Sequence, residues 1–484
     1  MKKVFLVILF FSTQIFSQTI SDALRFSLRP TGSGSRAISM GNAYIGVSDD
    51  FTSTMWNPAG LAQLNQIEVV GGFNSTSYNN KATFFGNTNE NDITSFSFDN
   101  FGLAIPLPTE RGSMVFAFGY LKNRDYARTV RFEGFNPKSS IIPALFDVDA
   151  KYDIPFQTYL SNSKGYSAII DSVTQYGESK ESGQQDMWVF SGAVDIAKNL
   201  SLGVTLNFIN GDYKFEREFI ETDTENKYNN TTPNLPNDSL YLRYNRFYLD
   251  NLVETKLEGF GATFGLMYRY FDRFRFGLTI ATPTLIKANE TYSDAGESLF
   301  DNGKYFKYSY GGPNTPVLNN YSVLTPWVLS GGVAIKPFDA ILISVDAEKI
   351  DYSQIAWEDN SDLEKTNISL QKNFKEVTNL RAGFELQIPD FFYLHNFCDK
   401  FLIRGGYSLT PSPYKNDSKE FDQKSVSVGA GIYFDEYVSL DLAIVNGNWK
   451  TYHNNYSLRG VTDPSRTEEK INTSILNFTL SYRF

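Results

Sequence analysis

Apolar and polar side chains alternate along most of the chain beyond about residue 66. In the last such segment one face carries Leu476, Phe478, Leu480, Tyr482 and Phe484, and the other carries Asn477, Thr479, Ser481 and Arg483. Successive side chains of a strand point to opposite sides, so this pattern predicts strands with one apolar and one polar face. Fourteen segments show it: 66–76, 94–105, 112–121, 186–197, 200–210, 259–270, 273–282, 326–337, 340–348, 377–388, 400–409, 424–434, 437–447 and 473–484.

Three further features favour a membrane barrel over a soluble β-sandwich, which would also alternate. The apolar faces end in Tyr, Phe or Trp, whereas the polar faces carry Gly, Ser, Thr and Arg. Aromatic girdles of this kind, and short turns opposite long loops, are typical of outer-membrane barrels. The sequence stops inside a predicted strand, which a barrel closed in lipid would pair. The short connections are 198–199, 271–272 and 435–436, and the long polar ones are 122–185, 211–258, 283–325 and 349–376.

The pattern therefore predicts an all-β fold, a transmembrane antiparallel β-barrel of about fourteen strands. Bacterial barrels have an even number of strands. An even number places both termini on the side of the short turns, which we expect to be the periplasm. The longest turn expected on that side is 389–400, which contains His395 and Cys398.

Two segments precede the barrel, which we assign to residues 66–484. Residues 1–17 join Lys2 and Lys3 to an apolar stretch and a small residue, Ser17. This is the composition of a secretory signal peptide, and it is too short to span a bilayer as a helix. Residues 18–65 are rich in Gly, Ala, Ser and Thr and too short for an independent domain. Their small side chains would fit between inward-facing strand residues, so we expect a plug, or hatch, inside the barrel.

Composition and motifs argue against several classes of function. The 484-residue chain is 15% aromatic, has one Cys and two His, and carries a formal net charge of −10. That charge argues against nucleic acid as a partner. The GxG of GFGATFG (259–265) lies inside a predicted strand and not in a strand-to-helix turn, so it does not indicate a nucleotide site. His395 and His453 are isolated, which argues against a zinc site. The acidic stretch 359–362 fits an exposed loop better than a calcium site. We expect no enzyme activity, no cofactor and no metal.

Four segments, in order along the chain, resemble the FadL/TodX family of outer-membrane transporters for hydrophobic compounds. They are SRAISMGNAYIGVSDDFTSTMWNPAGLAQL (35–64), GFGATFGLMYRYFDRFRFGLTIATPT (259–284), FLIRGGYSLTPSP (401–413) and SVSVGAGIYFDEYVSLDLAIVNG (425–447). NPAGLA matches the Asn-Pro-Ala element of the family's hatch, and the resemblance covers nearly all of the chain after the signal peptide. It implies a monomeric fourteen-stranded barrel with an N-terminal hatch, in contact with outer-membrane lipid and lipopolysaccharide.

The resemblance also implies a function, the passive uptake of long-chain fatty acids or aromatic hydrocarbons. Extracellular loops would capture the ligand, an apolar pocket in the lumen would hold it, and the hatch would move to open a passage. The ligand would leave sideways beside a kink in the third strand. That strand is RGSMVFAFGYLKNRDY (111–126), in which Gly119 would weaken pairing.

Candidate site residues follow from these expectations. The gating turn of the hatch is Asn57, Pro58, Ala59 and Gly60, where Asn57 suits a helix N-cap and Pro58 the first helical position; a purely structural turn is the alternative. Inward-facing cations would give charge-assisted hydrogen bonds to a ligand carboxylate, or would pair with lumenal carboxylates such as Glu385. These cations are Arg269, Arg275, Arg381 and Arg404.

The sequence leaves open the role of two aromatic segments and the choice between two functions. The aromatic segments 241–252 and 303–312 would either form an outer capture groove or pack on themselves. The alternative function is that of PorV-like plugged barrels, docking and shuttle components of type IX secretion that share a similar hatch. A plain diffusion pore is disfavoured because a plug would block it.

Overall fold

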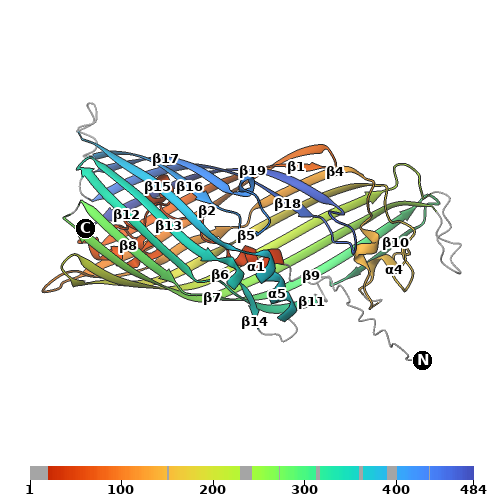
Figure 1. Cartoon of the computed structure of the whole chain (residues 1–484), viewed down its shortest axis with the longest axis horizontal. Coiled ribbons are helices and arrows are strands. Elements are labelled where there is room, and N and C mark those ends of the chain that lie inside the picture. Colours follow the sequence, from red (N-terminus) through yellow and green to blue (C-terminus); the bar gives the residue numbers. More distant parts are fainter. Residues whose placement is uncertain are drawn as a thin grey trace, which may run out of the picture.

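The structure is a computed structural model that describes residues 20–149, 152–228, 243–271, 273–311, 317–358, 364–389, 400–434 and 437–484. The described residues form one nineteen-stranded sheet. Fourteen strands follow one another, each antiparallel to the next, around a ring that closes when β19 pairs with β1 (Figure 1). The ring contains β1 (Glu68–Phe84), β2 (Asn87–Leu107), β3 (Met114–Asp125), β5 (Val173–Ala197), β6 (Leu200–Thr222), β7 (Tyr244–Tyr270), β8 (Phe274–Ala281), β12 (Val328–Phe338), β13 (Ile341–Asp351), β15 (Glu376–Pro389), β16 (Lys400–Thr410), β17 (Gln423–Phe434), β18 (Val438–Asn454) and β19 (Arg466–Arg483).

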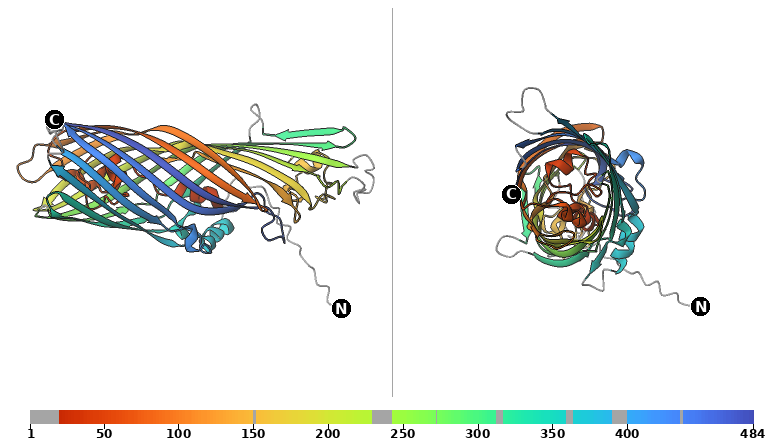
Figure 2. Two further views of the ribbon diagram at one scale, coloured as in Figure 1. Left: turned by 90° about the horizontal axis from the view of Figure 1, so that it is seen from above. Right: turned by 90° about the vertical axis from the view of Figure 1, so that its left-hand side faces the viewer.

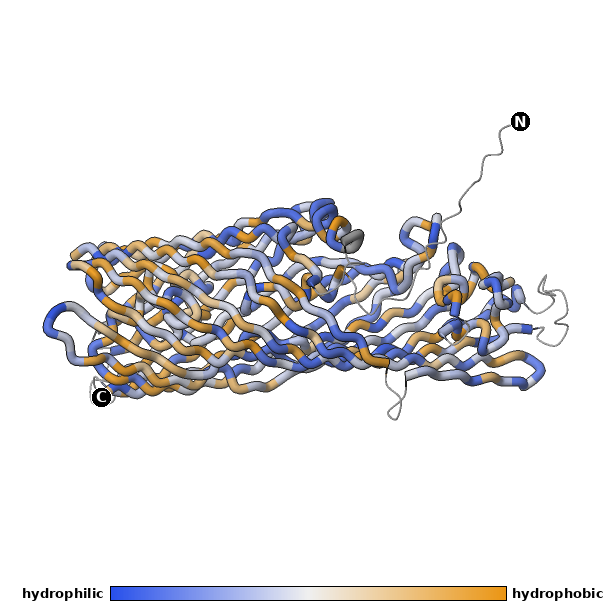
Figure 3. Tube along the Cα trace, turned by 90° about the horizontal axis from the view of Figure 1, so that it is seen from below, coloured by the Kyte–Doolittle hydropathy of each residue, from blue (hydrophilic) through white to orange (hydrophobic). Residues whose placement is uncertain are grey.

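The hydrophobic pattern of the wall is the reverse of that of a soluble protein. On β19 the apolar residues Leu476, Phe478 and Leu480 face outward, whereas Asn477 and Thr479 are buried in the lumen. In Figure 3 the hydrophobic colouring is concentrated in the half of the barrel that carries the C-terminus. An outward apolar face with a polar lumen suits a wall surrounded by lipid, so the predicted fold, a fourteen-stranded barrel, is confirmed.

The long connections differ from the sequence prediction, because much of their length is strand. β5, β6 and β7 run well beyond the predicted 186–197, 200–210 and 259–270 and extend the wall at the end opposite the C-terminus (Figure 1). Alternation is lost there because neither face meets lipid. This end also contains β4 (Arg128–Asn136), β9 (Leu285–Phe300), β10 (Tyr305–Tyr310), β11 (Val317–Leu324), η2 (Ile142–Leu145) and α4 (Ile154–Gln157); on one side of the barrel lie η3 (Tyr352–Gln354), β14 (Ala356–Glu358), α5 (Glu364–Asn373) and η5 (Lys419–Phe421).

The N-terminal segment lies inside the ring of strands, as the right-hand view of Figure 2 shows. It consists of α1 (Ile20–Ser27), α2 (Ser35–Ser39), α3 (Ser53–Trp56) and η1 (Pro58–Gln63). Almost all of its side chains between residues 32 and 64 are buried. Among the described residues, no helix combines the length and apolar character needed to cross a membrane.

The two ends of the described chain lie at different levels of the barrel. Phe484 donates a backbone hydrogen bond to Ile67 at 3.0 Å, at the end with the short turns, whereas α1 lies further along the lumen (Figure 1). The signal peptide 1–17, the turn containing His395 and Cys398, the acidic stretch 359–362 and the turn 435–436 lie outside the described residues. The periplasmic placement of both termini stays a prediction.

Candidate functional site

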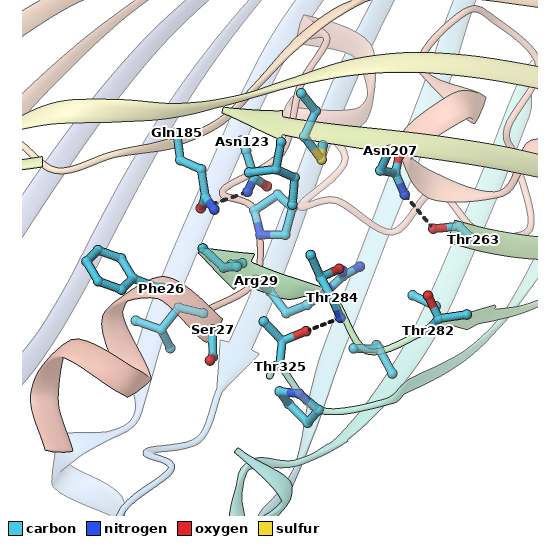
Figure 4. A pocket seen from close by; sticks show the side chains of 18 of the residues that line it. Phe26, Ser27, Arg29, Asn123, Gln185, Asn207, Thr263, Thr282, Thr284 and Thr325 are labelled. Atoms are coloured by element: carbon cyan, nitrogen blue, oxygen red, sulfur yellow. Dashed lines mark hydrogen bonds between the residues drawn. The ribbon is translucent and has the colours of Figure 1, made fainter. Parts of the chain in front are cut away.

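A cavity of about 80 Å³ lies in the lumen between the plug and the wall (Figure 4). Phe26 and Arg29 line it from the start of the plug, and Met55 lines it from α3. Strands β3 and β5 to β8 supply most of the remaining lining, which mixes amide and hydroxyl groups with apolar side chains. The wall residues include Asn123, Gln185, Met187, Asn207, Ile209 and Thr263.

The wall beside this cavity is interrupted between β2 and β3. Their backbone ladder runs only from Leu107↔Met114 to Asn100↔Leu121. Beyond it, residues 87–98 of β2 pair with β1, and β4 pairs with β5, so the facing edges of β2 and β4 share no described ladder. The exposed side chains of Phe96 and Phe98 belong to the part of β2 that has no ladder with β3.

The break coincides with a β-bulge at Asn123. Lys122 pairs with Asp186 and Arg124 with Gln185, so Asn123 is an extra residue in β3. A bulge bends its strand and redirects side chains. Gly119, the residue predicted to weaken this strand, instead pairs regularly with Gly102 and Val189. The structure thus places the irregularity further along β3 than the sequence prediction, and Gly119 makes room for the ring of Phe51.

Only side chains bridge the start of the break. Lys122 Nζ donates to Ser97 Oγ at 2.7 Å, and Ser95 Oγ donates to Asp125 Oδ2 at 2.6 Å. Lys122 and Asp125 also form an ion pair at 2.9 Å. Side-chain contacts of this kind separate at lower cost than a continuous backbone ladder, because each is a single bond that water can replace.

The Asn-Pro-Ala turn anchors the plug to the wall. Asn57 is buried; its Nδ2 donates to the carbonyl oxygens of Ile45 and Leu266, and its Oδ1 accepts from the Ala59 N–H, all at 3.1 Å. Asn57 therefore caps η1, as predicted, and joins two plug segments to β7. Pro58 occupies the first position of η1.

Glycines of the wall face the same turn. A β-carbon on Gly203 (β6) would collide with the backbone of Pro58 and Ala59, and one on Gly265 (β7) would collide with the Asn57 side chain. A β-carbon on Gly277 (β8) would overlap the carbonyl of Ile45. The small residues of the plug and the glycines of the wall together allow the two backbones to approach closely.

Replacing Asn57 with alanine should destabilise the protein by about 1–3 kcal/mol, because buried carbonyl and N–H groups lose their partners. The expected observation is a lower midpoint temperature for the loss of the folded, heat-modifiable form on gels. Asn79→Ala is the matched control, since the Asn79 side chain bonds only to the exposed Glu90 at 3.1 Å. Equal midpoints for the two variants would contradict this anchoring role.

The four candidate arginines each contact a protein carboxylate. Arg269 pairs with Asp195, Arg275 with Asp49, Arg381 with Glu348, and Arg404 with both Glu385 and Asp441. None of the four lines the cavity. Their role in binding a ligand carboxylate stays a prediction, and a ligand would have to displace a protein carboxylate from each of them.

Ion pairs also bind the plug to the wall at the end with the short turns. Arg36 of the plug donates to Asp49 at 2.5 Å and to Glu385 of β15 at 2.8 Å. Burial of Asp49 would raise its pKa, but the adjacent guanidinium groups of Arg36 and Arg275 hold that pKa below its usual range. Asp49 is therefore ionised in the folded protein and links these two arginines.

Several rings of the aromatic segments 241–252 and 303–312 are buried against other parts of the outer end. Within their described parts, Tyr244, Phe247 and Tyr310 are buried in one apolar cluster with Phe300 and Ile154. These buried rings face no groove, whereas Tyr305 is exposed, and a capture groove formed by these segments stays a prediction.

None of the site residues predicted from the sequence lines this cavity. Phe26 and Arg29 lie in the plug segment, but in a stretch without a motif. Asn123 and Gln185 lie near the two ends of the predicted connection 122–185. The run of Asn, Arg and Asp after the apolar part of the third strand was the available signal, because it marks where lipid-facing alternation stops.

Known structures share this architecture. A Pseudomonas aeruginosa FadL homologue aligns with a TM-score of 0.58 at 12% identity, over 94% of this chain and 99% of its own. The Pseudomonas putida toluene transporter TodX aligns with a TM-score of 0.54 at 12% identity, over 94% and 99%. The Ralstonia pickettii toluene transporter TbuX gives 0.50 at 14% identity, over 94% and 98%. At such identities these alignments establish the fold alone. No curated protein matches the chain.

The family model described as "Outer membrane protein transport protein (OMPP1/FadL/TodX)" matches residues 184–484, more than half of the chain. The matched region contains the wall from the end of β5 to β19, including the glycines that receive the Asn-Pro-Ala turn. The chain therefore belongs to this family of outer-membrane β-barrel transport proteins for hydrophobic compounds, and it is not an enzyme.

Proposed function

We propose that this protein carries hydrophobic molecules from outside the cell into the outer membrane, and that the ligand leaves the lumen sideways between β2 and β3. The observation that supports this most directly is the position of the lumenal cavity. Asn123 lines the cavity and is also the bulge residue beside the break in the wall. Asn123 thus connects the cavity with the break in the wall between β2 and β3.

A sideways exit also agrees with how firmly the plug is held. The plug is joined to the wall by the bonds of Asn57, by the glycine contacts and by the ion pairs of Arg36. A straight route through the barrel would require all of these to separate. Apolar surface gains about 25 cal/mol per Å² on leaving water, so a hydrophobic ligand is drawn towards lipid instead.

The Asn-Pro-Ala turn is proposed to control the part of the cavity lining that the plug supplies. Met55 lines the cavity and lies two residues before Asn57. A shift of residues 57–60 would therefore change the shape of the pocket without removing the plug. The exposed rings of the outer end, such as Tyr305, are proposed to make the first contact with the ligand.

A covalent link across the break should abolish uptake. In a chain in which Cys398 is replaced by serine, cysteines at Ser95 and Asp125, whose side chains are in contact, would be joined by a short bis-maleimide. Uptake of a labelled fatty acid or of toluene would be measured in cells that lack their own transporter. We expect the linked protein to fold and to lose uptake, because β2 and β3 can no longer separate.

The matched control links Ser408 and Ser425, which are partners in the regular ladder between β16 and β17. This link should leave uptake unchanged. Full uptake with the Ser95–Asp125 link would rule out the lateral route. If deleting the protein instead blocked the secretion of many proteins and left uptake intact, the docking function would replace this proposal.

A further inference from the structure

Both edges of the break between β2 and β3 carry a β-bulge. On β2, Asn100 and Phe98 pair with consecutive residues of β1, so Asp99 between them is an extra residue. On β3 the extra residue is Asn123. The β2–β3 ladder ends at Asn100↔Leu121, so one bulge lies on each strand just beyond the last pair. Bulges end strand pairing and redirect side chains, and they are common beside functional sites.

One segment of the plug, residues 29–34, bonds to both bulges; we call it the bridging segment. On the β2 side, Asp99 Oδ2 accepts from Ser33 Oγ and from the Gly34 N–H, both at 3.0 Å. Asn100 Nδ2 donates to Ser33 Oγ at 3.2 Å. Ser33, Asp99 and Asn100 are completely buried, so water does not compete for these bonds in the folded protein.

On the β3 side, the bridging segment bonds to the residues of the second bulge. The Thr31 N–H donates to the carbonyl oxygen of Asn123 at 3.4 Å, and Arg124 Nη1 donates to the carbonyl oxygen of Arg29 at 3.3 Å. The segment thus joins β2 to β3 from inside the barrel, where these strands no longer share a backbone ladder. The two edges can separate only if the bonds on at least one side are broken.

The bridging segment also lines the lumenal cavity. Arg29 and Pro30 contribute to the lining, as does the bulge residue Asn123. The cavity of about 80 Å³ is smaller than the roughly 150 Å³ of a cavity that holds benzene. A hydrophobic ligand of that size or larger can therefore enter only if part of the lining moves.

A ligand that does not fit the closed cavity binds more tightly to an enlarged one. Such a difference in affinity is what allows a ligand to shift an equilibrium between two conformations. Arg29 and Pro30 belong both to the lining and to the bridging segment. Their displacement therefore enlarges the cavity and loosens the connection between β2 and β3 in one movement.

We propose that the bridging segment keeps the lateral exit closed, and that a hydrophobic ligand which enlarges the cavity displaces the segment and opens the wall. This inference rests on the proposed function and adds to it the regulation of the exit. Asp99 is the main positioning residue, because it holds the segment to β2 without touching the cavity.

Spin labels can measure the separation of the two edges. In a chain in which Cys398 is replaced by serine, labels would be attached to Asp92→Cys on β2 and Arg131→Cys on β4, two exposed positions on opposite sides of the break. Distances would be recorded by pulsed electron paramagnetic resonance on the full-length protein in lipid nanodiscs, with and without toluene. We expect one short distance without toluene and an additional, longer distance with it.

Asp99→Ala removes both bonds that Asp99 makes to the bridging segment. We expect the ratio of open to closed molecules without toluene to rise about tenfold, since the loss of a buried hydrogen bond commonly shifts an equilibrium by that factor. Asp99→Asn keeps an acceptor oxygen and should restore most of the closed state. Arg124→Met removes a bond on the β3 side and should act in the same direction as Asp99→Ala.

Thr479→Val is the matched control. Thr479 Oγ1 accepts from the Ser35 N–H at 2.9 Å and lies 3.0 Å from Ser35 Oγ, so it also holds the plug, but to β19. This variant should keep the wild-type distances. Folding of each variant would be checked by heat-modifiable migration. Ser33→Ala, which removes a single hydroxyl, would replace Asp99→Ala if that variant did not fold.

Unchanged distances in Asp99→Ala and Arg124→Met would overturn the role of the bridging segment, and so would an equal change in Thr479→Val. Wild-type distances that toluene does not alter would overturn its displacement by a ligand. None of these results affects the lateral route itself, which the link between Ser95 and Asp125 tests separately. Full uptake with that link would refute the proposed function whatever the measured distances.

Discussion

Replacing Arg404 with methionine should lower the free energy of unfolding by about 3–5 kcal/mol, the usual cost of removing one partner from a buried ion pair. Arg404 is 1% exposed, and its guanidinium donates to Glu385 at 2.7 Å and to Asp441 at 2.5 Å. Its removal leaves Asp441 without a cation and Glu385 with Arg36 alone. The measurement is the denaturant midpoint of the folded barrel in detergent micelles.

Two comparisons separate the charge effect from lost packing. Lys349 and Glu376 form an exposed pair at 3.0 Å, so Lys349→Ala should change stability by less than about 1 kcal/mol. Adding Asp441→Asn to Arg404→Met should recover part of the loss, because it removes the uncompensated charge. If Arg404→Met and Lys349→Ala were equally stable, the interpretation of Arg404 as a buried structural cation would be wrong.

Replacing Gly203 with valine should displace the plug turn, although valine favours strands. The added side chain would overlap the backbone of Pro58 and Ala59, which the bonds of Asn57 hold in place. Overpacking of this kind costs about 1–3 kcal/mol or more. We therefore expect a lower unfolding midpoint together with a higher single-channel conductance in planar bilayers, since the plug no longer seals the lumen.

Gly71→Val is the matched control for this experiment. Gly71 lies on β1, and a β-carbon there would have its nearest neighbour, the Asn100 carbonyl oxygen, at 4.0 Å. This variant should keep the conductance and stability of the wild type. If Gly203→Val behaved in the same way, the wall glycines would not be needed to seat the plug.

The wall of the barrel was largely predictable from the sequence, because a strand that faces lipid on one side must alternate apolar and polar residues. Each of the fourteen predicted strands lies within or close to a strand of the ring. On β19, for example, the residues predicted to lie on the apolar face are exposed and those on the polar face are mostly buried. This alternation is not required in the parts of the strands that extend past the membrane. The outer halves of β5, β6 and β7 therefore read as loops, and β4, β9, β10 and β11 were missed.

The candidate site was predictable only in part. Asn57 and Pro58 carry a local signal, because capping and the first helical position are set by neighbouring residues. The partners of Asn57 on β7, and of Arg404 on β15 and β18, are far away in the sequence. Nothing near Gly119 revealed that the irregularity of β3 would fall at Asn123, since a bulge depends on the register with β5.

The sequence by itself determined the lipid-facing strands, the plug segment and the resemblance to the family, because alternation and turn chemistry act between residues close together in the chain. Only the tertiary structure decided which carboxylate each arginine meets, which glycines receive the plug and where the wall is interrupted. It alone brought Ser27, Asn123 and Gln185 to one cavity. Closing a ring of strands around a plug joins residues that are distant in sequence, and that closure created the site.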